Sequence, residues 1–163
     1  MTDQGRTATN SMTAEHAPIA QRLLTGFVAG FIAVPLFHQS VLALLVALGI
    51  VSAAPYSVEP AAVTGLPQVL SRALLGGVYG AVLIVLLERL PLRRMGAAFW
   101  VAALGIGAVL PSMVAWFILA PLKGRPLADG GDPNELSVAL VTNAAWAGGT
   151  AAIYWLLGRL RRG

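Results

Sequence analysis

A few polar side chains interrupt the long apolar stretches of this sequence, and they are its candidates for chemistry. They are His38, Gln39, Arg72, Ser112 and Asn143. An imidazole, two amides, a hydroxyl and a guanidinium at similar depth would line a small hydrated pocket. Polar and ionisable groups inside a membrane are costly to retain and therefore indicate function by default. The sequence predicts a polar site in the outer half of a membrane domain.

Two prolines accompany these residues. Pro35 stands three residues before His38, and Pro111 directly precedes Ser112. A proline inside a helix has no N–H to donate and leaves a carbonyl unpaired about one turn earlier. We expect a kink at each proline, with the freed carbonyls adding acceptors to the site.

Each polar residue also has a structural interpretation. His38 is the one histidine in the apolar stretches, so bis-histidine haem ligation between helices is excluded and a metal site lacks ligands. Arg72 either extends to the outer headgroups or, one turn before Gly76, points inward. An interhelical hydrogen bond is the expected role of Asn143. No metal and no cofactor is predicted.

The motifs of common enzymes are missing. The sequence has no glycine-rich phosphate loop, HExxH or GxSxG, and no acid within an apolar stretch. Acid–base and nucleophilic catalysis need positioned partners, which His38 lacks here. The chain is predicted not to be an enzyme; action on a lipid headgroup stays open only because Arg72 could hold a phosphate.

Four apolar stretches must position the polar residues. They cover residues 21–51, 66–87, 97–119 and 136–157. Each reaches the ~20 residues that cross a ~30 Å hydrocarbon core. The chain is 57% hydrophobic and 11% charged, with mean hydropathy +0.76, unlike a soluble domain. The predicted fold is an all-α, membrane-embedded bundle of four transmembrane helices, spanning residues 19–163.

Charge gives the predicted orientation. Arginines gather at the start of the first stretch, between the second and third, and after the fourth: Arg22, Arg89, Arg93, Arg94, Arg159, Arg161 and Arg162. By the positive-inside rule both termini face the cytoplasm. Residues 1–18 are polar and predicted to be a disordered cytoplasmic tail. Glu88 and Arg89 are interpreted as a solvated helix end. One lysine against ten arginines, with abundant Ala and Gly, indicates a bacterial inner membrane.

Small residues recur four apart in every stretch. The pairs are Gly26 and Gly30, Gly76 and Gly80, Ala103 and Gly107, and Ala145 and Gly149. Membrane helices gain contacts where small residues let their backbones approach, so a tight bundle without a wide pore is expected. Similar Gly, Pro and Leu-Leu patterns in the two halves suggest one helical hairpin used twice in parallel orientation.

Aromatic residues lie near the expected interfaces with water. Phe99, Trp100, Tyr154 and Trp155 mark the inner side, and Tyr56, Trp116 and Phe117 the outer side. Anchoring in the headgroup region explains them without a cofactor.

Three short segments carry a family resemblance: Phe37-His38-Gln39, Pro121-Leu122-Lys123-Gly124 and Asn143-Ala144-Ala145-Trp146-Ala147-Gly148. With these, the chain from about residue 21 to residue 157 resembles a family of small, uncharacterised four-span proteobacterial inner-membrane proteins. The resemblance implies the topology and a bacterial origin, and it lends no catalytic or binding residue.

Two functions from different classes follow. The first is an accessory or interaction subunit that packs in the lipid bilayer with other membrane subunits or with itself. The alternative is a small-solute or ion permeation unit that uses the polar site and the two prolines. No nucleic-acid partner is expected, because the basic residues flank apolar spans.

Overall fold

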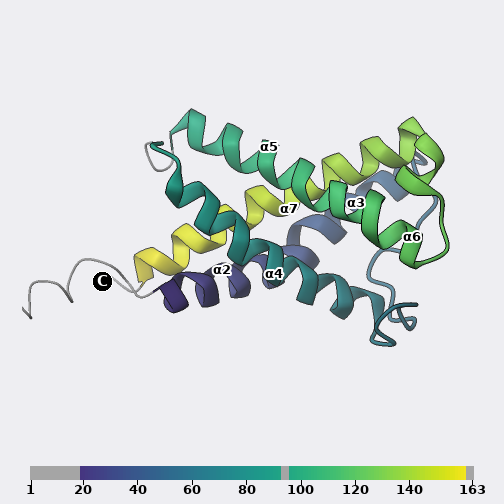
Figure 1. Cartoon of the computed structure of the whole chain (residues 1–163), viewed down its shortest axis with the longest axis horizontal. Coiled ribbons are helices and arrows are strands. Elements are labelled where there is room, and N and C mark those ends of the chain that lie inside the picture. Colours follow the sequence, from purple (N-terminus) through teal and green to yellow (C-terminus); the bar gives the residue numbers. More distant parts are fainter. Residues whose placement is uncertain (1–18, 93–95, 161–163) are drawn as a thin grey trace, which may run out of the picture.

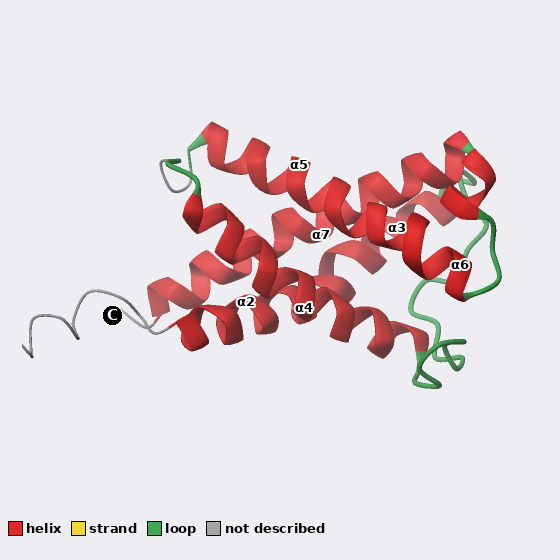
Figure 2. Ribbon diagram, viewed as in Figure 1, coloured by secondary structure: helices red, strands yellow, loops and turns green. Residues whose placement is uncertain are grey.

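The computed structural model describes residues 19–92 and 96–160 and consists of helices joined by loops (Figures 1 and 2). Four of its helical segments are long and apolar enough to cross a membrane: Ile19–Ala47, Gln68–Arg89, Ala97–Leu122 and Pro133–Leu160. The predicted all-α four-helix bundle is confirmed, and the chain is built as a multi-pass membrane protein. The predicted tail and Arg93, Arg94, Arg161 and Arg162 lie outside the described residues.

The first and third spans each change helix type along their length. The first runs through α2 (Ile19–Ala33), the π-helical segment η1 (Val34–His38) and α3 (Gln39–Ala47). The third runs through α5 (Ala97–Val114), the π-helical segment η2 (Ala115–Leu119) and the short α6 (Ala120–Leu122). The second and fourth spans, α4 (Gln68–Arg89) and α7 (Pro133–Leu160), are uninterrupted, and the 3₁₀ turn η3 (Leu127–Gly131) lies in the loop before α7.

The two prolines act differently on their helices. Pro35 lies inside η1, where the helix is widened to the π form; such single-turn π segments often occur at functional sites. Pro111 is buried within α5, which stays α-helical to Val114, and the π form begins only at Ala115. The helix geometry therefore changes at the first predicted kink position and one turn after the second.

The strongest packing joins α2 to the antiparallel α4 through glycines. A Cβ added at Gly26 would come within 2.9 Å of the Ala81 Cα, and one at Gly30 within 2.8 Å of the Gly80 Cα and against the Gly76 carbonyl oxygen. The backbones of the two helices thus touch directly, as small residues allow in lipid.

The second pair, α5 and α7, also packs closely, and α7 in addition contacts α2. Gly107 faces the Ala147 methyl group, and Gly149 lies under the Phe37 ring of η1. Trp146 of α7 is buried, and its indole N–H donates to the Gly30 carbonyl at 2.9 Å. Two antiparallel hairpins thus share one core, with Trp146 joining them.

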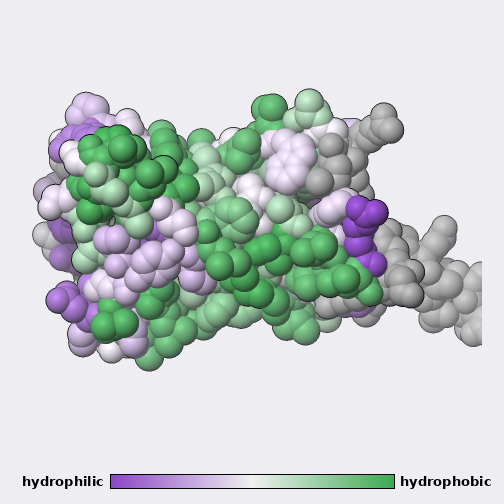
Figure 3. Space-filling view, turned by 180° about the vertical axis from the view of Figure 1, so that it is seen from behind, coloured by the Kyte–Doolittle hydropathy of each residue, from purple (hydrophilic) through white to green (hydrophobic). Residues whose placement is uncertain are grey.

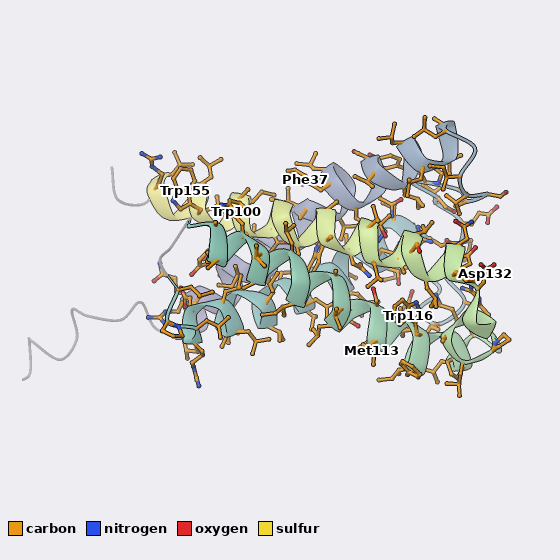
Figure 4. The ribbon with its side chains drawn as sticks, turned by 90° about the horizontal axis from the view of Figure 1, so that it is seen from above. Phe37, Trp100, Met113, Trp116, Asp132 and Trp155 are labelled. Carbon is orange, nitrogen blue, oxygen red and sulfur yellow. The ribbon has the colours of Figure 1, made fainter. Side chains whose placement is uncertain are left out.

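The ends and the sides of the bundle differ in polarity. Arg22, Arg89 and Arg159 lie at one end, here called the arginine-rich end; residues 48–67 and 123–132 form the other, the loop end (Figure 1). Trp100 and Trp155 lie toward the arginine-rich end and Trp116 and Asp132 toward the loop end (Figure 4). Figure 3 shows much apolar surface on the sides between them, which in a membrane faces acyl chains.

Candidate functional site

The glycine contacts between α2 and α4 set which residues of the first hairpin meet near the loop end. Gly26 and Gly30 lie against Gly80 and Gly76. Further along the first span, the Val34 side chain lies against Gly76, and η1 contacts α4. Arg72 is one turn from Gly76 toward the loop end. The Gln39 amide accepts the Tyr56 N–H, and the next residue, Ser57, accepts the Val69 backbone N–H at 3.0 Å, so this amide lies near the start of α4. The fold therefore places His38 and Gln39 of the first span in the same region of the first hairpin as Arg72 of α4.

Three nitrogen atoms in this region are buried and have no hydrogen-bond partner among the described residues. They are His38 Nδ1, Gln39 Nε2 and Arg72 Nη1. Gln39 is completely buried, at 0% exposure. A buried polar group left unpaired lowers the stability of a protein by about 1–3 kcal/mol. Three such groups in one region are therefore strongly destabilising unless water or a ligand bonds to them.

The other ends of two of these side chains are held by the protein. The Gln39 Oε1 accepts the Tyr56 backbone N–H at 3.0 Å, and Arg72 Nη2 donates to Gln68 Oε1 at 3.3 Å. Because a backbone N–H must face an oxygen, the first contact also fixes the Gln39 amide with its NH₂ group turned away. The Gln39 amide and the Arg72 guanidinium are thus each held by one hydrogen bond, while Gln39 Nε2 and Arg72 Nη1 stay unpaired.

The loop between α3 and α4 covers one side of this site. Its Tyr56 has a positive φ of 56°, and its hydroxyl donates to the Pro35 carbonyl at 2.9 Å. The same hydroxyl lies 2.9 Å from Ser40 Oγ. Tyr56 was predicted only as an interface anchor, because the sequence does not show that this loop returns to the middle of the first span.

Ser112 and Asn143 form a separate and self-contained pair. Asn143 Nδ2 donates to Ser112 Oγ at 2.9 Å, and the Ser112 hydroxyl donates to the Ala108 carbonyl at 2.6 Å. This is the interhelical bond expected of Asn143, and it joins α5 to α7. None of the hydrogen bonds of these described residues connects the pair to His38, Gln39 or Arg72. Of the five predicted site residues, hydrogen bonds therefore link only Ser112 and Asn143 to each other in the described part of the chain.

A fourth unpaired donor lies in the third span. The Trp116 indole nitrogen, in η2, is buried and has no partner in the described part of the chain. Figure 4 places Trp116 toward the loop end, near Met113. The four buried nitrogens without partners among the described residues thus lie in the loop-end half of the bundle, and three of them belong to the first hairpin.

The arginine-rich end carries a polar cluster that was not expected. Glu88 accepts from Arg22 at 3.1 Å and from the Tyr154 hydroxyl at 2.9 Å. Its side chain is 15% exposed, so the interpretation of Glu88 as a solvated end is wrong. The carboxylate ties α2, α4 and α7 together, a contact that depends on pairings between distant segments; Arg89 is exposed as expected.

Comparisons with known proteins add no relative. No protein family, no curated protein and no solved structure matches this chain at a significant level.

Proposed function

We propose that the protein is a membrane-embedded unit that binds a small solute or ion and takes part in its permeation, with His38, Gln39 and Arg72 as the binding residues. The observation that carries the proposal is the group of three buried nitrogens without partners beside a π-helical turn. Polar groups retained in a membrane domain and left unsatisfied by the protein indicate that something else satisfies them.

Helix packing supports this function over an accessory subunit. The small-residue seams that suggest external partners are occupied inside the chain: Gly26, Gly30, Gly76, Gly80, Gly107 and Gly149 all face its own helices. An interaction role stays a prediction without a specific contact surface to support it.

Flux into proteoliposomes tests the proposal. Purified protein is reconstituted and assayed with a panel of small neutral, cationic and anionic solutes. We expect at least one solute to enter faster than in empty liposomes, with the rate reduced at least tenfold by His38→Ala or Arg72→Ala. The matched control is Asn143→Ala, which removes a polar group that the protein already satisfies. Equal flux in protein-containing and empty liposomes for the whole panel contradicts the proposal.

We also propose a bacterial inner membrane as the location, with both termini in the cytoplasm. The support is the charge asymmetry of the sequence together with the arginine-rich end at which α2 begins and α4 and α7 end. Reporter fusions after Arg89 and Leu160 should both show cytoplasmic activity, and a fusion in residues 123–132 the opposite. Reporters at Arg89 and Leu160 on different sides of the membrane contradict this orientation.

A further inference from the structure

We infer that the site formed by His38, Gln39 and Arg72 takes a singly charged oxyanion, a carboxylate or phosphodiester group. The inference rests on the proposed function and adds the chemical class of the ligand. It follows from which atoms of the site the protein already uses and which it leaves free.

The free atoms of the site are hydrogen-bond donors. Gln39 has its oxygen engaged by Tyr56 and its NH₂ group unpaired, and Arg72 has one terminal nitrogen bonded to Gln68 and the other unpaired. A neutral imidazole can also present an N–H at Nδ1. A ligand that completes these bonds must supply acceptor oxygens, and a group with two such oxygens, as in a carboxylate or a phosphodiester, suits a guanidinium.

The charge of the site also selects an anion. Arg72 has no ion-pair partner among the described residues, although it is half-buried. The two spans that form the site contain no acid except Glu88, which is held by Arg22 and Tyr154 at the arginine-rich end. One guanidinium without a carboxylate balances one negative charge, as on a carboxylate or on the phosphodiester of a lipid headgroup.

A cation fits the same atoms poorly. Metal cations such as Ca²⁺ and Mg²⁺ need several oxygen ligands, while the Gln39 oxygen is already bonded to Tyr56. A cationic solute would be repelled by Arg72 at short range. The acceptor chemistry is shared by soluble monoanions and by phospholipids, so the experiment separates these two sources.

The test is thermal unfolding of the delipidated protein in a neutral detergent. Soluble oxyanions are supplied as sodium acetate or sodium dihydrogen phosphate replacing sodium chloride. The lipid source is supplied as dihexanoyl phosphatidylglycerol, with dihexanoylglycerol as the same lipid without its phosphate. Glycerol and choline serve as neutral and cationic probes.

Four variants are compared with the wild-type protein. Arg72→Met removes the charge, and Gln39→Glu keeps the oxygen that Tyr56 needs while replacing the free NH₂ group by a negative oxygen. Arg89→Met is the matched control, since Arg89 is an exposed arginine of the same helix at the other end. Arg72→Lys keeps the charge without the planar fork.

We expect a saturable rise of the melting temperature with at least one oxyanion. Arg72→Met and Gln39→Glu should lower the apparent affinity for this anion at least tenfold. Arg72→Lys should keep part of the affinity, and Arg89→Met should leave it unchanged. A response to phosphatidylglycerol alone assigns the anion to a lipid headgroup, and a response to acetate or phosphate assigns it to a soluble solute; both support the inference.

Two results would overturn the inference of an oxyanion ligand, and they differ in whether the proposed binding function also fails. If glycerol or choline gives the saturable response and Gln39→Glu alters that response, the proposed binding function stands and the anion class is wrong. If no probe of any charge shifts the melting temperature of the wild-type protein, both the inference and the proposed function are contradicted.

Discussion

Two groups of polar residues, one in each hairpin, are used in opposite ways. In the α5–α7 hairpin, Asn143 donates to Ser112 and Ser112 to the Ala108 carbonyl, and among the described residues neither side chain has a buried polar atom without a partner. In the α2–α4 hairpin the protein engages the Gln39 oxygen and one Arg72 nitrogen, and the remaining donors stay unpaired. A polar residue in a membrane span thus either joins helices or is kept for a ligand, and its unpaired atoms tell the two apart.

The backbone contact of the first hairpin gives the largest expected effect. Gly30→Ala would drive a methyl group against the Gly76 carbonyl and the Gly80 Cα, backbone atoms that cannot yield. We expect a loss of about 3 kcal/mol in the free energy of unfolding, measured by denaturation in mixed micelles. The control is Gly105→Ala, whose added methyl meets nothing; a similar loss in both variants contradicts the direct contact of α2 and α4.

The hydrogen bond from Trp146 to Gly30, which joins the two hairpins, is expected to contribute less to the free energy of unfolding. Trp146→Phe keeps an aromatic ring near Tyr79 and removes the N–H that reaches the Gly30 carbonyl. A net loss of about 1 kcal/mol follows from one neutral hydrogen bond. The companion variant Trp100→Phe tests the general cost of this exchange, since Trp100 lies toward the arginine-rich end (Figure 4). Equal losses in the two variants remove the special role of Trp146.

Asn143 and Ser112 in the second hairpin should show a small but measurable coupling free energy. A double-mutant cycle of Asn143→Ala and Ser112→Ala isolates the bond between them, for which about 0.6 kcal/mol is the typical value in membrane helices. Additive losses, with no coupling, show that the pair does not hold α5 to α7.

Removal of the unpaired charge in the first hairpin should have the smallest effect on stability. Arg72→Met takes away a half-buried guanidinium without a counter-ion, so the ligand-free protein should be unchanged within about 0.5 kcal/mol or become more stable. The measurement is unfolding after delipidation. A loss above about 1 kcal/mol indicates a structural role for Arg72 and removes the contrast between the hairpins.

The positions of the four spans and of the packing glycines could be predicted from the sequence, because they depend on local residue pattern and on the thickness of the bilayer. Its four spans differ from the observed helices by a few residues at most ends, since ~20 apolar residues are a strong constraint. The glycines that were expected to pack, such as Gly30 and Gly80, face neighbouring helices because small residues are how such helices approach.

The contacts that could not be predicted from the sequence depend on which distant segments of the chain meet in the fold. The return of Tyr56 to Pro35, the bond from Trp146 to Gly30 and the ion pair of Glu88 with Arg22 join residues far apart in the chain. The bond between Ser112 and Asn143 also follows from helix pairing, since these residues belong to α5 and α7. Depth along a helix can be read from the sequence, but the neighbouring helix cannot.

Cysteine accessibility tests the contrast most directly, because the chain contains no cysteine of its own. His38→Cys and Ser112→Cys are compared in intact membranes for their rate of reaction with a small anionic methanethiosulfonate reagent. If the first hairpin keeps a hydrated, anion-attracting site, His38→Cys should react at least tenfold faster than Ser112→Cys, and Arg72→Met in the same background should slow it. Equal, negligible rates at the two positions would show that no water or solute reaches His38 and would contradict the account.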